Sequence, residues 1–477
     1  MATVTIMDPV TRIEGHMKVE LTIDQKNGHL QVLDARCTGT LFRGFETLLQ
    51  GRDPWDAPIL TQRICGVCPV AHAMASVMAL DAAAGRPAPT DARVLRNLVL
   101  GSNFIQSHIL HFYLLAALDY VPAPQSAPWK PLWTVGMIND PALTNVSGHL
   151  AQAVEARRRA HEMGAVFGGR MPLPHTYIPG GFTSVPTAGR IQQFRDHLIW
   201  LTNFIQTVYL PDVQTVAALY SDYAQIGKGC GRLLSYGVFD ENNTGSVKLL
   251  KRGVVNVSAP NAVQAFSPGS ITESVKHSWY ADGTNNLQPS SGSTQPVYPK
   301  ADAYSWLKAP RYKGNPCEAG PLARMWVSGD YRDGVSVMDR HAARAKEALK
   351  IANAMEGWLN DLTPGAKVHN DYETPANGTG VGFTEAARGA LGHWVKISNG
   401  KISLYQVITP TCWNASPRDS SDVPGPMEQA LIGTPIQDAA RPIEALRVIH
   451  SFDPCLSCAV HVTRPGAKPV VIHTGAK

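Results

Sequence analysis

Charged side chains are scarce in this sequence. Asp, Glu, Lys and Arg make up 17% of its 477 residues, against about 25% in typical globular proteins. The 43 basic and 38 acidic residues give a formal net charge of +5, with no run of Lys and Arg. We therefore expect no nucleic-acid partner, because a phosphate-binding stripe is missing. The low charge content predicts that much of the surface is buried, within the chain or against a large partner interface.

Cysteine is also rare, with 8 residues, and four of these stand in two CxxC pairs. So few cysteines in so long a chain argue against a disulfide scaffold and favour metal or redox chemistry. Hydrophobic residues make up 44% of the sequence, which is enough for a large core. The other four cysteines show no metal-binding spacing and are expected to be small buried hydrophobes; they are Cys37, Cys230, Cys317 and Cys412.

Membrane and export signals are missing as well. The first residues, "MATVTIMDPVTRIEG", contain no basic region followed by an apolar one, so we expect no secretion signal in this chain itself. The uncharged stretch 97–118 has the length of a membrane span, but it contains Asn97, Asn103 and His108 among other polar residues. Such side chains are costly in lipid, so a helix buried in protein is predicted, and no transmembrane segment.

Periodicity predicts a mostly helical chain. Hairpins are expected around Asn27-Gly28 and Asn399-Gly400, because Asn-Gly favours the tight turn between two strands. Apolar residues at helical spacing predict long helices; these cover 61–84, 90–120, 150–167, 191–220, 339–362 and a late helix within 441–455. The segment 234–331 is rich in Gly, Ser, Pro and Asn and is expected to be a loop-rich insertion with small strands. The predicted fold class is α+β, mostly α: a long buried helix bundle with small peripheral β-sheets.

The two CxxC pairs stand near opposite ends of the chain. "RICGVCPVAH" (63–72) contains Cys65 and Cys68, and "SFDPCLSCAVH" (451–461) contains Cys455 and Cys458. This spacing lets both thiols of a pair face one metal ion. If the pairs share one site, residues 1–461 must form a single interlocked body.

The spacing alone leaves structural zinc, a catalytic metal and separate thiol roles open. Zinc ribbons usually keep their pairs within a few tens of residues, and a chain with its own large core has little need of a zinc staple. Thiolates suit copper(I), iron, nickel or zinc, and not magnesium or calcium.

The residues around the cysteines strongly resemble the large subunit of nickel-iron hydrogenases. The resemblance covers nearly the whole chain through "DPVTRIEGH" (8–16), "LFRGFE" (41–46), "SHILHFY" (107–113), "APRYKGNPCEAGPLARMW" (309–326) and "EAARGAL" (385–391). "QSHILHFY" and "GPLARMW" resemble the nickel-iron-selenium branch, with Cys455 where that branch has selenocysteine. The resemblance implies the hydrogenase large-subunit fold and reversible, heterolytic cleavage of H2 into protons and electrons. The electrons would pass to an iron-sulfur small subunit, since this chain has no further cysteine cluster.

The resemblance also implies roles for the cysteines. Cys65 and Cys455 would be terminal nickel ligands, while Cys68 and Cys458 would bridge nickel to an iron that carries one carbon monoxide and two cyanides. Thiolates are strong donors to such metals. The terminal thiolate of Cys455 would accept the proton from H2.

Four further residues match the family's catalytic surroundings. Glu14 would be the first proton relay, and Arg388 would lie above the open metal position with Asp453 as its carboxylate neighbour. His72 would hydrogen-bond a bridging sulfur. Without the resemblance, these would be a solvated glutamate, a surface ion pair and a core histidine. Ser107 stands where many family members have an aspartate.

A third metal is implied by Glu46, His461 and a backbone carbonyl near Val407. Carboxylate and carbonyl oxygens suit magnesium, the metal usual at this position. Because imidazole is a less usual ligand for magnesium, iron and calcium stay open.

The sequence continues past His461 as "VTRPGAKPVVIHTGAK" (462–477). By resemblance, a maturation endopeptidase would cut after His461 and remove this extension. The partner subunit often carries a twin-arginine signal, which implies a periplasmic location by co-export, with membrane association, while a cytoplasmic location stays open. The glycines of "NGTGVGF" (377–383) do not open a helix after a strand, so no dinucleotide site is expected.

Three alternatives remain. A hydrogen-sensing subunit would share the metal site, but such sensors are expected to lack the cleavable extension. A relative of the quinone-site subunit of respiratory complex I would keep the fold without the four cysteines. A structural zinc protein would fit the spacing but not the flanking motifs.

Overall fold

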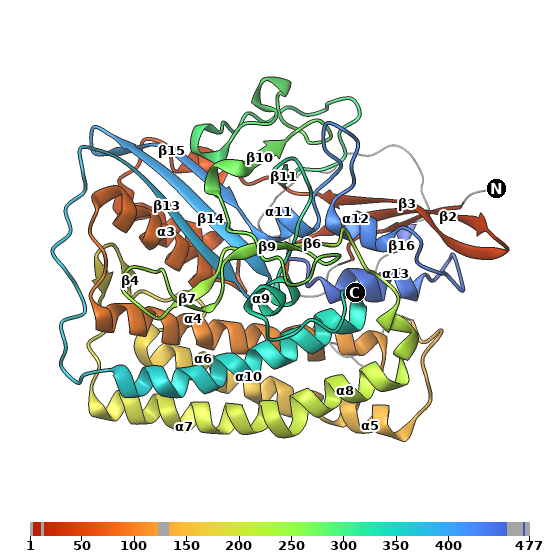
Figure 1. Ribbon diagram of the computed structural model, residues 1–477, viewed down its shortest axis with the longest axis horizontal. Helices are drawn as coiled ribbons and strands as arrows, with labels where there is room; N and C mark the ends of the chain where they lie inside the picture. The colour runs from red at the N-terminus through yellow and green to blue at the C-terminus, as the bar shows by residue number, and fades with distance from the viewer. Residues whose placement is uncertain (1–2, 11–13, 123–132, 456–470, 473–477) are drawn as a thin grey trace.

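Long helices lie side by side in one layer of the molecule (Figure 1). The layer consists of α4 (Thr90–Leu110), α6 (Leu150–Gly168), α7 (Ala188–Phe204) and α10 (Val337–Asp361), in which α4 packs on α6 and α10. The computed structural model describes residues 3–10, 14–122, 133–455 and 471–472. Polar side chains in the middle of α4 are buried, and several of them are bonded, as for Asn103, whose amide donates to the carbonyl of Val67 at 2.9 Å. Among the described residues, no helix has both the length and the apolarity needed to cross a membrane.

Two of the predicted helices change their winding. The α4 helix, which has Pro89 as its N-cap, continues through the π-helical turn η3 (His111–Ala116) and the 3-10 turn η4 (Ala117–Asp119). The α7 helix continues through a second π-helical turn, η5 (Ile205–Tyr209), into α8 (Leu210–Leu219). Pro211 lies in the first turn of α8, and its missing amide hydrogen and bulky ring disrupt the regular α-helical bonds before it.

The first CxxC motif interrupts the helix predicted over 61–84. The chain forms η1 (Pro54–Asp56), α2 (Ala57–Thr61) and η2 (Gln62–Ile64), and α3 starts only at Pro69 and runs to Ala84. The reason is Pro69, because a proline disfavours helical backbone at the residue before it. Cys68, the residue before it, is accordingly the N-cap of α3, while Cys65 has extended backbone. The prediction of a continuous helix was wrong at the motif itself.

A three-stranded antiparallel sheet covers α3. It consists of β13 (Asn377–Ala386), β14 (Gly389–Ser398) and β15 (Lys401–Ile408), and the turn at Asn399-Gly400 confirms the second predicted hairpin. The strand β13 was not predicted. Its glycines allow close packing: a Cβ on Gly380 would lie 1.9 Å from the carbonyl oxygen of Ala79 in α3.

A second sheet, with the strand order β16-β1-β2-β3, lies at the end of the molecule opposite to this one (Figure 1). The first predicted hairpin is confirmed by β2 (Met17–Lys26) and β3 (His29–Gly39), while β1 (Thr3–Met7) pairs with β2. The short strand β16 (Val471–Ile472) pairs in parallel with β1. The end of the sequence thus adds an edge strand to the sheet that the start of the sequence builds.

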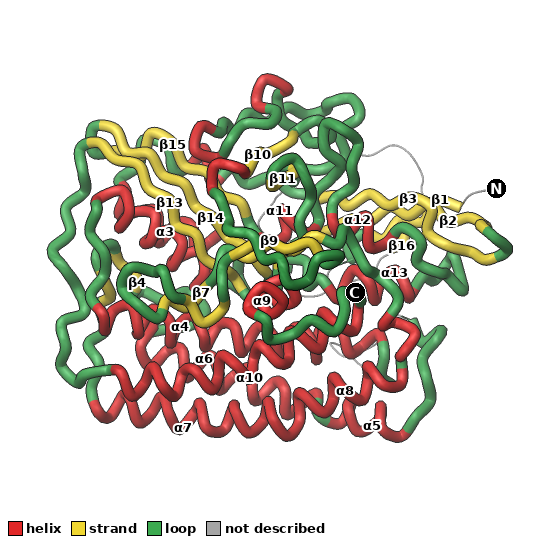
Figure 2. The backbone as a smooth tube through the Cα atoms, viewed as in Figure 1, coloured by secondary structure: helices red, strands yellow, loops and turns green. Residues whose placement is uncertain are grey.

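The segment 234–331 contains short strands joined by loops, as predicted, and loop colouring dominates this part of Figure 2. Its elements, with the strand preceding it, are β6 (Arg232–Ser235), β7 (Val238–Asp240), β8 (Lys248–Leu250), β9 (Gly253–Asn256), β10 (Ile271–Ser274), β11 (Ala309–Tyr312), β12 (Glu318–Ala319) and α9 (Pro321–Ser328). The remaining helices and strands are α1 (Phe45–Leu48), α5 (Pro141–Gly148), β4 (Tyr177–Ile178), β5 (Gly181–Phe182), α11 (Pro410–Asn414), α12 (Pro426–Leu431) and α13 (Ile443–Ser451). The mostly helical fold with small sheets agrees with the predicted class.

Candidate metal centre

Three cysteine sulfurs meet in the interior. The Sγ atoms of Cys65, Cys68 and Cys455 lie within 4.8 Å of one another, and those of Cys65 and Cys455 are 3.2 Å apart. All three residues are buried. Cys458, the fourth expected ligand, lies outside the described residues. The structure therefore brings together three of the four predicted cysteines across 390 residues of sequence.

Backbone structure near each cysteine holds its sulfur in place. The amides of Val67 and Cys68 donate to Sγ of Cys65 at 3.4 and 3.3 Å. On the other side, α13 ends at Ser451 and the chain turns at Asp453, which has a positive φ of 56°. Aspartate tolerates this left-handed conformation better than most residues. After the turn, the amide of Cys455 donates to Oγ1 of Thr411 at 3.1 Å.

The cluster favours protonated thiols when no metal neutralises it. Hydrogen bonds with Cys455 and Cys65, together with burial, raise the pKa of Cys68 well above its ordinary value. A metal ion needs thiolate ligands, so its binding must release these protons. Three soft donors within reach of one another fit nickel, iron, copper(I) or zinc and not a hard cation.

Arg388 places a buried positive charge beside the sulfurs. Its Nε donates to Oδ1 of Asp453 at 2.9 Å. Burial alone would lower the pKa of Arg388, but Asp453 and the three cysteines keep it well above its ordinary value. Within the described parts of the chain, the two terminal nitrogens of Arg388 and Oδ2 of Asp453 have no hydrogen-bond partner.

A second buried arginine supports the turn that carries Arg388. The two terminal nitrogens of Arg324 in α9 donate to the carbonyls of Ala386 and Ala387, at 3.0 and 2.8 Å. Arg324 also pairs with Glu347 of α10 at 2.6 Å and with Glu385 of β13 at 2.8 Å. Arg324 and Glu385 lie in the motifs "GPLARMW" and "EAARGAL", but neither residue was predicted to have a role. The burial of these two residues and the contacts that they make are not visible in the sequence.

His72 lies one helical turn after Cys68 and is completely buried. Its Nδ1 is 3.1 Å from Nε2 of His393 in β14. Its Nε2 has no partner among the described residues. Burial lowers the pKa of His72 to about 4, although the charge of Cys65 acts in the opposite direction.

Glu14 contacts the first cysteine motif. Its Oε1 accepts a hydrogen bond from the amide of Gly66 at 3.1 Å. A Cβ on Gly66 would come within 3.3 Å of Oε2, so the glycine permits this close approach. The side chain is partly exposed, and Glu14 thus lies between the buried cluster and the outside.

Ser107 is buried in α4, and its hydroxyl has no partner in the described part of the molecule.

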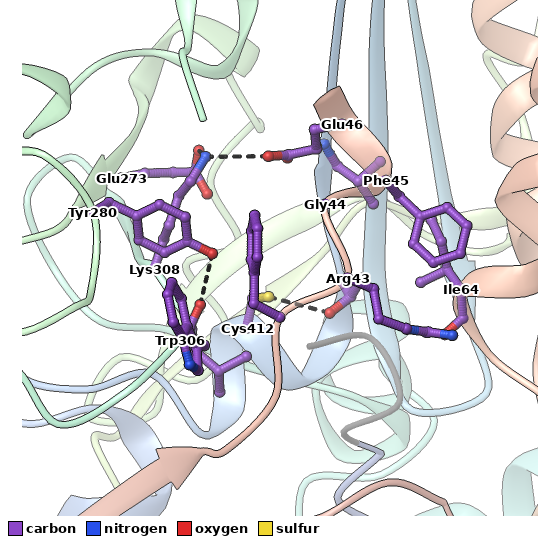
Figure 3. A pocket seen from close by; sticks show the side chains of 14 residues that line it. Arg43, Gly44, Phe45, Glu46, Ile64, Glu273, Tyr280, Trp306, Lys308 and Cys412 are labelled. Carbon is purple, nitrogen blue, oxygen red and sulfur yellow. Dashed lines mark hydrogen bonds and ion pairs between the residues drawn. The ribbon is translucent and has the colours of Figure 1, made fainter. Parts of the chain in front are cut away.

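The expected third metal site lies in a pocket of about 80 Å³ (Figure 3). Oε1 of Glu46 accepts from the amide of Val407 at 2.9 Å, and Lys308 lies 3.6 Å from Oε2. Glu273 is the second carboxylate near Lys308, at 3.3 Å. Arg43 also lines the pocket, so two carboxylates and two cationic side chains surround it. His461 lies outside the described residues.

Lys308 was not predicted to lie at this pocket, and neither was Cys412. Lys308 also donates to Oε1 of Gln406 at 3.1 Å and lies 5.5 Å from the ring centre of Tyr280. Cys412 lines the pocket and is partly exposed, as Cys230 is elsewhere, so the expectation of full burial was wrong for these two. Cys37 and Cys317 are buried as expected.

The site combines a buried cluster of thiols with an arginine, a histidine and a partly exposed carboxylate. These features are typical of one class of protein, the metalloenzymes with a soft-metal centre. The fold of this chain is shared with hydrogenase large subunits. A [NiFeSe] hydrogenase structure from Desulfovibrio vulgaris Hildenborough superposes with a TM-score of 0.91 at 41% sequence identity, covering 97% of this chain and 100% of that chain. The reduced, active [NiFeSe] hydrogenase from Desulfomicrobium baculatum gives the same TM-score and identity over 96% of this chain.

Sequence comparison agrees. The family model described as "Nickel-dependent hydrogenase" matches residues 43–138, 137–334 and 328–461, and one described as "HoxL-like" matches 3–37. The periplasmic [NiFeSe] hydrogenase large subunit of Desulfomicrobium baculatum is 42% identical over 96% of this chain and 94% of its own length. The uptake hydrogenase large subunit of Bradyrhizobium diazoefficiens is 35% identical, over 96% of this chain and 95% of its own.

The chain therefore belongs to the nickel-dependent hydrogenase family, as a large subunit. It is an oxidoreductase that acts on hydrogen. The resemblance predicted from the motifs is confirmed, including the similarity to the nickel-iron-selenium branch. The chain is 42% identical to the [NiFeSe] large subunit of Desulfomicrobium baculatum and 35% identical to the uptake hydrogenase large subunit of Bradyrhizobium diazoefficiens.

Proposed function

We propose that this chain cleaves H2 reversibly and heterolytically at a nickel-iron centre held by Cys65, Cys68, Cys455 and Cys458. The observation that carries the proposal is the meeting of three cysteine sulfurs within 4.8 Å beside a buried arginine. The donor set fits, because these sulfurs are soft ligands without a carboxylate among them. Nickel, with an iron that carries one carbon monoxide and two cyanides, would supply the Lewis acidity that polarises the H–H bond.

The chain's own residues would handle the proton. Sγ of Cys455 would hold it first, because a metal-bound thiolate is a weaker base than a free one and can pass a proton on near neutral pH. Glu14 would take it next. Its contact with Gly66, adjacent to Cys65, supports this order, since the carboxylate touches the motif and is partly exposed.

Arg388 would orient the reacting hydrogen from above the cluster. Its two terminal nitrogens, which have no hydrogen-bond partner among the described residues, supply positive charge in a buried site, where such a charge acts strongly. Asp453 would keep the guanidinium in place through its bond to Nε.

A third metal, magnesium or else iron or calcium, would be held by Glu46, His461 and the backbone at Val407. The pocket beside Glu46, with the carboxylate oxygens of Glu46 and Glu273 in its lining, supports a cation there. This metal would link the C-terminal residues to the sheet at β15.

The partner would be a small subunit with iron-sulfur clusters that takes the electrons away. We also propose that an endopeptidase removes residues 462–477 after His461. The location would be periplasmic, with membrane association through the small subunit; the name of the Desulfomicrobium baculatum relative, a periplasmic hydrogenase, supports the compartment.

Infrared spectroscopy of the complex, purified from its native host, tests this function. Carbon monoxide and cyanide stretches that shift under H2 are expected, and elemental analysis should find nickel, with iron in excess of nickel because the clusters of the small subunit also contain iron. Cys455→Ala should abolish nickel retention, because a terminal ligand is lost, whereas Cys317→Ala, at a buried cysteine away from the cluster, should retain it. A complex with trimmed large subunit that holds zinc and shows no such bands would contradict the proposal.

A further inference from the structure

A group of buried polar atoms lies where η3, η4 and α10 contact α13. Nδ1 of His111, both ring nitrogens of His341, Nε of Arg344 and the hydroxyl of Tyr120 have no hydrogen-bond partner among the described residues. All four residues expose at most 2% of their surface. Buried polar atoms without a partner are rare in folded proteins, because each one costs free energy. We call these four residues, His111, Tyr120, His341 and Arg344, the His341 cluster.

The side chains of the His341 cluster are neighbours. The rings of His111 and His341 stack, with their centres 5.5 Å apart and their planes at 28°. The ring of Tyr120 stands edge-on to that of His341, with the centres 6.1 Å apart. His341 and Arg344 are three residues apart on α10, so they project from the same side of this helix.

Two consecutive carbonyls at the end of α13 connect His111 with Arg344. Nε2 of His111 lies 2.7 Å from the carbonyl oxygen of His450. A terminal nitrogen of Arg344 donates to the carbonyl of Ser451 at 3.0 Å. The cluster is therefore one site, and it adjoins the segment of α13 that leads to Cys455.

The bond to His450 determines what His111 offers to a ligand. A carbonyl oxygen only accepts, so Nε2 of His111 must carry a proton. Burial lowers the pKa of His111 and that of His341 well below the ordinary value, and neighbouring cationic side chains act in the same direction. Both rings are therefore neutral. Nδ1 of His111 is a bare acceptor, while His341 offers one donor and one acceptor.

Arg344 adds a buried positive charge to this site. Within the described ranges, its hydrogen bonds go to backbone carbonyls, those of Arg340 at 3.3 Å and of Ser451 at 3.0 Å. Its Nε–H is left as a donor. A buried charge without a carboxylate partner needs other polar groups around it.

We propose that the His341 cluster binds ordered water. The ligand must accept from Nε of Arg344 and donate to Nδ1 of His111, which water does and a halide or a carboxylate cannot do. With bonds of about 2.9 Å on both sides, one water molecule spans about 5.8 Å, close to the 5.5 Å between the two stacked rings. A buried water makes about three hydrogen bonds, so the five atoms need at least two molecules. This water solvates Arg344 and connects α10 and η3 to the end of α13, whatever reaction the chain carries out.

A crystal structure of the full-length chain, at a resolution that shows ordered water, tests the proposal. We expect water density within hydrogen-bond distance of Nδ1 of His111 and of a ring nitrogen of His341. A site without such density would overturn the proposal. Density with the anomalous signal of chloride would show an anion there and would overturn it as well.

Oxygen-17 magnetic relaxation dispersion, which counts the water molecules held inside a protein, tests it in solution. His341→Leu removes two of the five polar atoms, so the count of the full-length chain should fall by at least one. Met355→Leu is the matched control, because Met355 is buried in the same helix and has no hydrogen-bonding group that this change removes; it should leave the count unchanged. Equal counts for the natural chain and His341→Leu would refute the site. If His341→Leu fails to fold, the crystal structure of the natural chain decides alone.

Discussion

Glu14 shows how much one contact can decide at the scale of a residue. Its carboxylate bonds the amide of Gly66, between the two cysteines of the first motif, and still reaches the outside. A solvated glutamate at a strand start would not make this contact. The position supports a proton relay between the cluster and the surface, as the sequence resemblance implied.

The relay role predicts a specific loss. Glu14→Gln keeps an oxygen for the amide of Gly66 but cannot bind and release a proton near neutral pH. The variant complex should retain its metals and bind hydrogen, but lose most of its hydrogen-deuterium exchange activity, measured by mass spectrometry under mixed gas.

Glu20→Gln serves as the control for this variant. Glu20 lies on β2 and pairs with Lys18 at 2.9 Å in a half-exposed position, so its substitution should not affect exchange. Unchanged exchange in Glu14→Gln would remove Glu14 from the proton path.

The glycines of β13 matter at the scale of the element. A Cβ at Gly380 would lie 1.9 Å from the carbonyl oxygen of Ala79, and one at Gly382 would lie 1.9 Å from that of Ala75. The sheet can approach α3 closely only because these side chains are missing. This approach brings His393 within hydrogen-bond distance of His72.

Gly380→Ala should therefore separate strand and helix. We expect the free energy of unfolding to fall by about 1–3 kcal/mol, as for overpacked cores. The contact between His393 and His72 should also weaken. Urea unfolding of the full-length chain measures the loss. Gly357→Ala on α10, where a Cβ meets no atom within 4 Å, should be neutral or slightly stabilising, since alanine favours helix. Equal effects of the two substitutions would contradict the packing argument.

Arg324 connects three elements to the turn before Arg388. Its guanidinium contacts Glu347 of α10, Glu385 of β13 and the carbonyls of Ala386 and Ala387. Arg324→Lys keeps the charge but loses the planar array of donors, so it cannot make all these bonds.

We expect the Arg324→Lys complex to retain nickel but to lose at least tenfold in hydrogen oxidation, because Arg388 is no longer held in place. Lys substitution of Arg195, a surface residue paired with Glu356 at 2.8 Å, should leave activity unchanged. Full activity in Arg324→Lys would show that the turn holds its shape without this support.

Buried charge has consequences for the whole molecule. Burial raises the pKa of Glu385 to about 7, although Arg324 acts against it. Burial would also raise the pKa of Glu347, but Arg324 and His108 bring it to about 2. Arg324 thus stabilises the negative charge of Glu347, whereas Glu385 takes up a proton near neutral pH.

The stability of the fold should therefore depend on pH. Between the ordinary value of 4.5 and about 7, the folded chain binds a proton at Glu385 that the unfolded chain does not. The stability contributed by this group is complete below the lower value and is lost as pH rises through the higher one. Relative to Glu385→Gln, the natural chain should lose at most about 3 kcal/mol across this window.

Urea unfolding midpoints of the full-length chain at several pH values would measure this difference. Glu356→Gln, at a largely exposed position, is the control and should follow the natural chain. Parallel curves for the natural chain and Glu385→Gln would show that another group titrates in this range.

The sequence contains few charged residues, and some of these few are buried in the interior and not on the surface. Buried pairs such as Arg340 with Glu318, at 2.7 Å, and Arg311 with Asp419, at 2.6 Å, show that even part of the small charged set lies inside. The remaining surface suits the large partner interface proposed above. The domain boundary at 461 and the removal of 462–477 stay predictions, since both depend on residues outside the described ranges.

The sequence by itself determined the features that local chemistry controls. Asn27-Gly28 and Asn399-Gly400 gave both hairpins because an Asn-Gly turn needs no distant partner. Helical periodicity gave the long helices to within a few residues, and the flanking motifs of the cysteines gave the family. The local pattern predicted one helix through the first CxxC motif, which Pro69 interrupts. It also missed β13, a strand that packs on α3 through its glycines.

Only the tertiary structure decided which distant residues meet. His393 and Tyr405 reach His72 because β14 and β15 lie on α3, and Arg324 reaches the turn before Arg388 because α9 packs beside β13 and α10. Neither set of contacts can be predicted from neighbouring residues in the sequence, because the contacts depend on how helices and sheets pack and not on propensity or spacing. The cysteines could be predicted from their motifs, whereas the residues that hold and polarise their surroundings could be found only from contacts in the folded chain.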